Sequence, residues 1–387
     1  MLKIALATFY DPRGGSRFAA KMTYRLRELE RRADGLEYLG PLCTARYRPL
    51  QAAKWLFYRH VQGKRYLPTR DSRLIASFGR QLAHKLAKSD ANVVLSLSTP
   101  SSQPVAYLDC AQPIVIWSDA TFAGAMETHP TLARERLCQE SLRDALANER
   151  AALERCRLAV YFSDWAAQSA IAHYGLDPAK VRVVPGGANL DAALAPSEVE
   201  TVVASRPADR CNLLFIAHRW QDKGGEIAIE VTRALNESGL PTTLTIVGAP
   251  PEGYDALPPF VKLTGMLRKS VSREFRTLQT LFRQAHFLIL PTRAEAFGLV
   301  FCEASAYAVP SLATRVGGVP TAVVDDRNGK LFPLDAGAEA YCAYIDETLR
   351  GFARYRDLAR SSFNEYTTRL NWHAAATAMH RHMRELL

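Results

Sequence analysis

The sequence lacks several features that mark other classes of protein. No apolar stretch of the 387 residues approaches the roughly 20 that a helix needs to span a bilayer. The seven cysteines are scattered and include no C-x-x-C pair, which indicates a reducing compartment and no structural zinc site. The apolar run at residues 3–9 is short and predicts a first strand instead of a signal peptide. We therefore expect a cytoplasmic protein.

Two nucleotide-binding signatures are also missing. The sequence contains neither G-x-G-x-x-G nor G-x-x-x-x-G-K-[ST], so the fingerprints of dinucleotide-binding dehydrogenases and P-loop NTPases are absent. His373, His380 and His382 have no acidic or cysteine companions at ligand spacing, which argues against a metal site near the end of the chain.

Acidic residues are scarce in the first half of the chain. Residues 13–88 contain 18 Lys and Arg but five Asp and Glu, and the whole chain carries a formal charge of +10. This excess of positive charge favours an anionic partner, which can be a membrane surface, a phosphorylated lipid or a nucleic acid. The aromatic and basic residues at 54–59 suit peripheral contact with the inner face of the membrane. The alternative is that residues 46–88 form helices that pack on a sheet and expose their basic faces to solvent.

Short apolar runs alternate with helical patterns in both halves of the chain. This alternation predicts α/β architecture with parallel sheets, and 387 residues are too many for one ordinary core. The polar, turn-rich stretch at residues 192–209 is the expected linker. We predict domains of residues 1–195 and 196–371, followed by a helix over residues 372–387.

The most informative stretch follows the apolar run at residues 287–290, which predicts a buried strand. Residues 298–308 are small or apolar and suit a helix packed on a sheet, with Glu303 as their only charge. A carboxylate on such a helix is costly to desolvate, so it needs a partner that the helix does not supply. Glu295 lies just before this helix. Both carboxylates can therefore face one crevice at the strand end and bind neighbouring hydroxyls.

The sequence from Glu295 to Glu303, E-A-F-G-L-V-F-C-E, resembles the E-x7-E motif of the retaining GT-B glycosyltransferases of family 4. It follows a strand and Pro-Thr and precedes a Gly-Gly-Val-Pro loop, a context more specific than two glutamates alone. The alternative is one charge at a helix N-terminus and one surface glutamate.

The resemblance implies a GT-B fold, in which two doubly wound Rossmann-like domains face each other across a cleft and the last helix crosses back to the first domain. It implies transfer of a hexose from a nucleotide-diphosphate sugar, with retention of configuration, to a glycan, lipid-linked or small-molecule acceptor. The sequence contains no D-x-D, the metal-binding motif of the GT-A enzymes, so we expect no metal and no other cofactor.

The resemblance also implies roles for the residues of the motif. Glu295 would hold hydroxyls of the donor sugar and support the developing oxocarbenium charge, and Glu303 would bind the ribose diol. Phe297, Gly298 and Leu299 would contribute backbone N–H groups, Phe297 towards the sugar and the other two towards the diphosphate.

Cations for the diphosphate are expected after the first strand of the second domain. The family pattern is G-R-x4-K-G; Lys223 matches its lysine, whereas His218 stands at the place of the arginine and Arg219 follows one residue later. Gly15, in a Gly-Gly turn after the first strand of the chain, would also lie near the diphosphate. Leu267 is the candidate for backbone contact with the base.

Asp119 stands where most family members have a histidine. Its carboxylate can hydrogen-bond the donor sugar or an acceptor hydroxyl, but it cannot act as a neutral imidazole would; it can also be a helix N-cap. The departures at Asp119 and His218 leave open a GT-B-like protein that binds without turnover. A basic nucleic-acid-binding protein is the other alternative, although the sequence has no helix-turn-helix, zinc-finger or RNP pattern.

Overall fold

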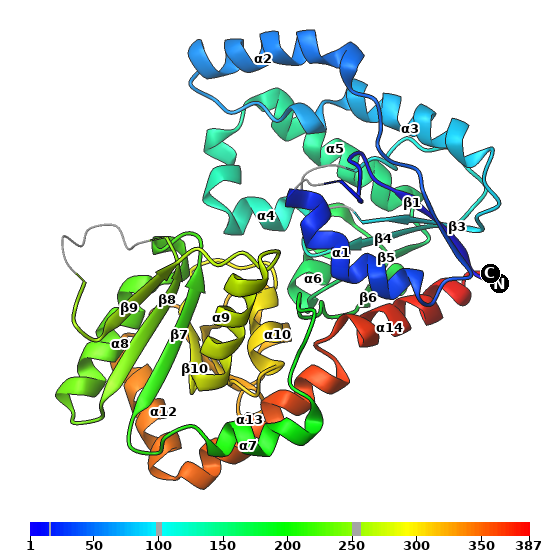
Figure 1. The fold of residues 1–387 in the computed structure, drawn as a ribbon. Coiled ribbons are helices and arrows are strands. Elements are labelled where there is room, and N and C mark those ends of the chain that lie inside the picture. Colours follow the sequence, from blue (N-terminus) through cyan, green and yellow to red (C-terminus); the bar gives the residue numbers. More distant parts are fainter. Residues whose placement is uncertain (15–16, 98–102, 250–256) are drawn as a thin grey trace. The chain divides into compact units, whose positions relative to one another are not determined.

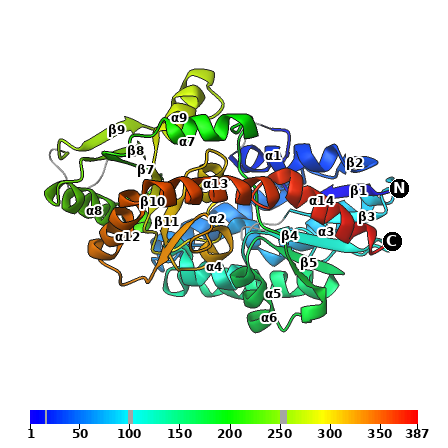
Figure 2. The same ribbon diagram turned by 90° about the horizontal axis from the view of Figure 1, so that it is seen from below.

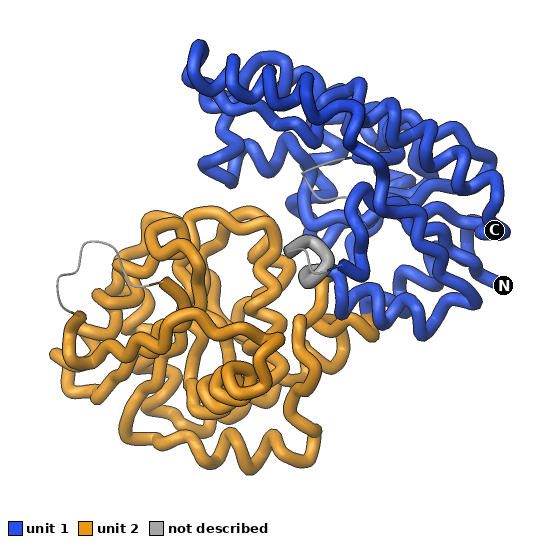
Figure 3. The backbone as a smooth tube through the Cα atoms, turned by 45° about the horizontal axis from the view of Figure 1, so that its top comes forward, with its two compact units in different colours: residues 1–185, 375–387 blue, residues 186–374 orange. Residues whose placement is uncertain are grey.

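The computed structural model describes residues 1–14, 17–97, 103–249 and 257–387, with the backbone alone for residues 17–21. The chain forms two compact units, each built on a parallel sheet and coloured separately in Figure 3. Unit 1 contains Met1–Pro185 and Ala375–Leu387, and unit 2 contains Gly186–Ala374. The division therefore falls after Pro185, at a Pro-Gly-Gly sequence, instead of after residue 195.

The sheet of unit 1 has the strand order β2-β1-β3-β4-β5-β6, and every neighbouring pair is parallel. Its strands are β1 (Lys3–Ala7), β2 (Gly35–Tyr38), β3 (Val93–Ser96), β4 (Ile114–Ser118), β5 (Leu158–Tyr161) and β6 (Val181–Val183). Strands β3, β4 and β5 are buried along their whole length, as apolar runs in a parallel sheet should be. The edge strand β2 is only partly buried and has no apolar run, which is why the sequence did not predict it.

Helices cover this sheet and add an outer layer to unit 1 (Figure 1). They are α1 (Arg17–Glu30), α2 (Arg48–His60), α3 (Ser72–Leu86), α4 (Phe122–Thr128), α5 (Gln139–Arg155), α6 (Asp164–Tyr174) and the greater part of α14 (Trp372–Arg384). Helix α3 buries one apolar stripe, which includes Leu74, Phe78 and Leu82. Helix α2 does not: no residue of it, all of them described, is buried. The alternative that residues 46–88 form helices packed on a sheet therefore holds for α3 and is wrong for α2.

Unit 2 has the strand order β12-β11-β10-β7-β8-β9, again parallel throughout. Its strands are β7 (Cys211–Ala217), β8 (Thr242–Gly248), β9 (Val261–Gly265), β10 (Phe287–Leu290), β11 (Ser311–Thr314) and β12 (Gly329–Phe332). Its helices are α7 (Val199–Ala204), α8 (Gly225–Glu237), α9 (Ser272–Gln284), α10 (Leu299–Ser305), α11 (Val319–Ala322), α12 (Ala338–Arg350) and α13 (Phe352–Thr368). Helix α13 packs against α7, α10 and α12 (Figure 2). Among the described residues of both units, no helix has the length and apolar character that crossing a bilayer requires.

The strand order of unit 2 reverses direction between β7 and β10. The chain runs outward from β7 through β8 to β9, and then returns to form β10 on the other side of β7. In open α/β sheets, ligands bind beyond the carboxyl ends of the strands at such a switch point. The loops that follow β7 and β10 therefore mark the position of a candidate site.

Candidate functional site

Lys223 and Glu295 come together at the switch point of unit 2. Lys223 ends a 3₁₀ turn after β7, and Glu295 lies in the loop after β10. The Lys223 Nζ atom is 2.7 Å from Glu295 Oε2 and also donates to Thr292 Oγ1 at 3.3 Å and to the Ala294 carbonyl at 3.1 Å. The two side chains are 18% and 21% exposed, so solvent reaches the ion pair but hydrates it only in part. The sequence predicted both residues but not that they pair.

Two glycines with left-handed backbone hold the loops around this ion pair. Gly317 has φ of +50°, and a Cβ atom there would lie 2.1 Å from the carbonyl oxygen of Glu295. Gly224 has φ of +70°, and its Cβ would lie 2.0 Å from the carbonyl oxygen of Pro291. The Gly318 N–H donates to that same Glu295 carbonyl at 3.1 Å. The position of Glu295 thus depends on backbone approaches that only glycine permits.

We expect Gly317→Ala to lower the free energy of unfolding of unit 2 by about 2–4 kcal/mol, because the left-handed backbone and the displaced carbonyl both cost free energy. Gly239→Ala is the matched control in the same unit, since Gly239 has φ of +92° but nothing lies within 4 Å of the place that a Cβ atom would take there. The control should lose only about 1 kcal/mol. Urea unfolding measures the free energy of unfolding of both variants. Equal decreases would show that the close approach of Gly317 to the Glu295 carbonyl does not contribute to stability.

Helix α10 begins beside Glu295. Gly298 is its N-cap, with φ of +85°, and Leu299 is its first residue. The Phe297 side chain is 2% exposed and belongs to the core, so only its backbone is available to a ligand. The start of α10 therefore follows Glu295 closely along the chain.

Glu303 has the partner that its apolar helix does not supply. The residue is 6% exposed, and its carboxylate forms an ion pair with Lys269 Nζ, which comes from the loop after β9. Lys269 Nζ also donates to the Asn189 carbonyl at 3.1 Å. The charge on α10 is therefore balanced by a lysine that no motif indicated.

The other predicted residues of the second domain are more exposed. Arg219 forms an ion pair with Asp222, Nη1 to Oδ2 at 2.8 Å, and its side chain is 45% exposed. His218 is exposed as well, and Leu267 is half-buried just after β9. Gly15 of the first domain lies outside the described residues.

Asp119 follows β4 in unit 1, close to a buried arginine that the sequence analysis missed. Arg25 of α1 is 3% exposed, and its guanidinium lies 4.8 Å from the centre of the Trp117 ring. Burial lowers the pKa of Arg25 to about 10, opposed by the charges of Tyr10 and Asp119, which raise it. The sequence does contain a signal for this burial, because Arg25 lies three residues after Met22, on the apolar stripe of the helix.

Asp119 is not the N-cap of the helix that follows it. That position belongs to Thr121, whose side chain accepts a hydrogen bond from Gly124 N at 3.0 Å. The N-cap alternative for Asp119 is therefore wrong, and its carboxylate has no capping role.

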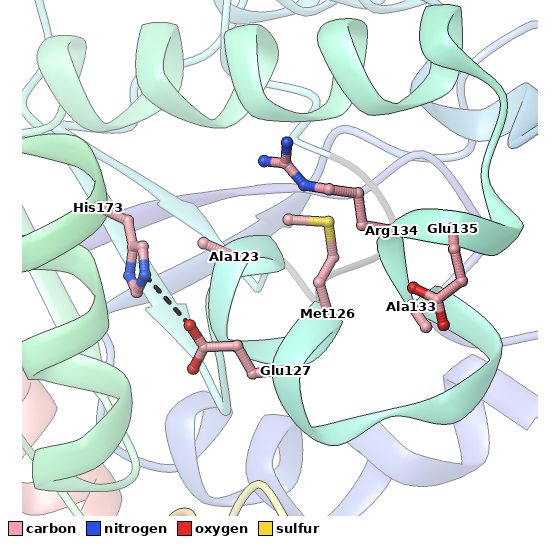
Figure 4. A pocket seen from close by; sticks show the side chains of 7 residues that line it. All are labelled: Ala123, Met126, Glu127, Ala133, Arg134, Glu135 and His173. Carbon is pink, nitrogen blue, oxygen red and sulfur yellow. Dashed lines mark ion pairs between the residues drawn. The ribbon is translucent and has the colours of Figure 1, made fainter.

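Unit 1 also contains a pocket of about 300 Å³ beside α4. Seven residues line it: Ala123, Met126, Glu127, Ala133, Arg134, Glu135 and His173. His173 Nε2 lies 3.2 Å from Glu127 Oε1, as Figure 4 shows. None of the predicted site residues lines this pocket. Within the part of the chain that the structure describes, no group of three or more His, Cys, Asp or Glu side chains is placed to hold a metal ion.

Two family models match the chain, one in each unit. The model described as Glycosyltransferase Family 4 matches residues 17–192, and the model described as Glycosyl transferases group 1 matches residues 210–350. The D-inositol 3-phosphate glycosyltransferase of Jonesia denitrificans is 28% identical over 277 residues, which are 66% of this chain and 64% of the relative. The protein of the same name in Streptomyces scabiei is 32% identical over 175 residues, 42% of this chain and 39% of the relative. The chain thus matches less than two thirds of the length of these relatives.

Solved structures show the same fold at low identity. The sucrose-phosphate synthase of Thermosynechococcus elongatus matches with a TM-score of 0.67 and 18% identity, over 100% of this chain and 99% of that one. The Anabaena protein HepE in complex with UDP and glucose matches with a TM-score of 0.58 and 17% identity, over 100% of both chains. These structures show that the chain has the GT-B fold, and the two family models, which match residues 17–192 and 210–350, show that it belongs to the group 1 glycosyltransferases of family 4.

Proposed function

We propose that this protein transfers a hexose from a nucleotide-diphosphate sugar to an acceptor hydroxyl, with retention of configuration and without a metal ion. The observation that carries the proposal is the ion pair between Lys223 and Glu295 at the switch point of unit 2. A cation and a carboxylate side by side match a ligand that has a diphosphate next to a polyhydroxylated ring. Family membership favours this function over nucleic-acid binding.

The ion pair suits two successive tasks. Without a ligand, the Lys223 ammonium balances the carboxylate of Glu295 at 2.7 Å. A bound diphosphate offers Lys223 a more highly charged acceptor, which leaves the Glu295 oxygens for the hydroxyls of the sugar. As the glycosidic bond breaks, the diphosphate gains negative charge and the sugar gains positive charge. Lys223 stabilises the first charge and Glu295 the second.

Glu303 has the chemistry to bind the ribose. A carboxylate can accept hydrogen bonds from both hydroxyls of a diol, and Glu303 lies on the helix that starts beside Glu295. Lys269 balances its charge and anchors the loop after β9 to the Asn189 carbonyl. That loop includes Leu267, whose backbone would contact the base.

The remaining roles complete the proposal. The N–H groups of Gly298 and Leu299 would donate to the diphosphate, and Gly15 would approach it closely. Arg219 is an auxiliary cation, and its Nη1 atom lies 2.8 Å from Asp222 Oδ2. Asp119 of unit 1 would hydrogen-bond the donor sugar or an acceptor hydroxyl. The acceptor is a glycan, a lipid-linked sugar or a small polyol; the name of the relatives makes an inositol phosphate the first one to test.

The test is a thermal-shift screen with UDP-, GDP- and ADP-sugars, followed by an assay of nucleoside-diphosphate release. A ligand that binds only the folded state should raise the melting temperature by on the order of 5 °C at a hundred times its Kd. The complex of HepE with UDP and glucose makes UDP-glucose the first donor to test.

Three outcomes decide the proposal. Donor hydrolysis without acceptor, unaffected by EDTA, supports an enzyme that needs no metal ion. A thermal shift with no release of nucleoside diphosphate indicates a protein that binds without turnover. No shift with any sugar nucleotide contradicts the proposal, and the anomeric configuration of the product, read by NMR, tests retention.

A further inference from the structure

Helix α2 is attached to unit 1 by its polar side. The residues that face the unit are Gln51, Lys54 and Tyr58, which share one face of the helix by their i, i+3, i+7 spacing. The Lys54 Nζ atom lies 2.7 Å from Asp71 Oδ2 and 2.5 Å from Glu140 Oε1, and the Tyr58 hydroxyl donates to Glu140 Oε2 at 3.0 Å. Gln51 donates to a backbone carbonyl at 2.9 Å. Polar side chains therefore hold α2 on unit 1, and no residue of this fully described helix is buried.

The apolar side chains of α2 and the residue after it are exposed. They are Leu50 (41% exposed), Trp55 (40%), Leu56 (51%), Phe57 (47%) and Val61 (70%). By their spacing of seven and four residues, Leu50, Phe57 and Val61 run beside Lys54, at the edge of the attached face. Leu56 lies on the side opposite Lys54 and Tyr58. The described residues include eleven large hydrophobic side chains that are exposed, and five of the eleven lie between residues 50 and 61. Such clustering marks an interaction surface rather than scattered exposure.

The surroundings of this surface are strongly basic. Residues 38–70 contain seven Lys and Arg and no Asp or Glu. Lys54 is balanced by Asp71 and Glu140, but Arg48 and Arg59 are exposed and lie, by their spacing, on the side of the helix that carries Trp55 and Leu56. The Arg59 guanidinium lies 4.9 Å from the centre of the Trp55 ring, an arrangement typical of side chains at a water–lipid boundary.

We propose that α2 and Val61 dock on an anionic lipid bilayer, with the apolar surface at the boundary between headgroups and acyl chains and with Arg48 and Arg59 on lipid phosphates. Apolar and basic residues on one exposed helix are the requirements for interfacial binding. A second copy of the chain is a poorer occupant, because a symmetric contact would bring the same positive charges together. A nucleic acid would match the arginines and rings but would leave Leu50, Leu56 and Val61 without apolar contact.

The test is co-sedimentation of the full chain with vesicles of phosphatidylcholine, alone or mixed with phosphatidylglycerol. We expect binding to the mixed vesicles and little to the neutral ones. The double variant Leu56→Ser/Phe57→Ser should lower the partition coefficient about tenfold, and Arg48→Gln/Arg59→Gln about 25-fold, or fivefold for each charge. Leu334→Ser is the matched control, since Leu334 is 59% exposed in unit 2; it should bind like the unchanged protein.

A second measurement locates the contact. Tryptophan emission should shift to the blue when mixed vesicles are added, and Trp55→Phe should abolish most of that shift. All the substituted side chains are exposed, so the variants should keep the melting temperature of the parent. Equal binding by the Leu56/Phe57 variant, or equal binding to neutral vesicles, would overturn the proposal. A dimer or an RNA complex that this variant loses, without vesicle binding by the parent, would overturn it in favour of those occupants. None of these outcomes depends on the donor site in unit 2.

Discussion

Glu295→Gln should lower the rate of sugar transfer by about a hundredfold, the usual loss when one charge-stabilising contact in a transition state is removed. Glutamine keeps the size and a hydrogen-bonding oxygen but removes the negative charge that opposes the developing positive charge of the sugar. It also removes the negative charge that pairs with the Lys223 ammonium at 2.7 Å. The variant should fold normally, because the Glu295 side chain is partly exposed and its backbone hydrogen bond with Gly318 is retained.

Kinetic comparison with Lys223→Met separates the two members of the pair. Loss of the lysine should weaken donor binding and slow transfer, and the double variant should be less impaired than the sum of the single losses, because the charges are coupled. Arg219→Gln is the control: Arg219 is exposed and tied to Asp222, so its loss should cost less than tenfold. Near-full transfer by Glu295→Gln, with the fold unchanged, would remove Glu295 from the catalytic machinery.

The strands were predictable wherever burial leaves an apolar run. Residues 287–290 form β10 as predicted, and β3, β4 and β5 are likewise short apolar runs that are buried along their whole length. The edge strand β2 was missed because an edge strand that is half-exposed has no reason to be apolar. Helix α10 is shorter than the expected helix over residues 298–308: it begins at Leu299 and ends at Ser305, before Pro310.

Candidate site residues could be proposed from the sequence where a motif lies within one short segment, but not where contacts join distant segments. Glu295, Gly298, Leu299 and Glu303 are close in sequence, and their spacing carries the signal. Lys269 lies 34 residues from Glu303, in a loop without a motif, so the sequence indicated that Glu303 needs a partner but not which residue it is.

Helices α2 and α3 show what periodicity alone leaves undecided. The apolar residues of α3 fall on one stripe, and the structure buries them. In α2, Trp55, Leu56 and Phe57 are consecutive, so its apolar residues do not form the narrow stripe that packs on a core. The position of α2 follows instead from its ion pairs with Asp71 and Glu140, and Glu140 is 86 residues away from Lys54.

Acid should destabilise unit 2 through His286, which is fully buried at the start of β10. Burial lowers the pKa of His286 from 6.5 to about 4. Its Nε2 donates to the Pro207 carbonyl at 2.9 Å, and its Nδ1 accepts from Asn212 N at 2.9 Å, so a proton on Nδ1 would displace the second bond. The folded protein therefore stabilises the neutral imidazole. Protonation of Nδ1 removes the hydrogen bond that it accepts from Asn212 N in β7.

The direction of this pH dependence follows from the protons that the folded and unfolded chains bind. Between pH 6.5 and about 4 the unfolded chain binds a proton on this histidine and the folded chain does not, so stability is complete above pH 6.5 and falls as the pH is lowered. The full shift is worth about 3 kcal/mol. Hydrogen exchange of β7 and β10 at pH 7 and pH 4 should show this loss in the parent protein. His286→Gln, which cannot ionise, should be less stable at pH 7 but should lose about 3 kcal/mol less on acidification. Parallel losses in the two proteins would mean that other groups cause the acid sensitivity.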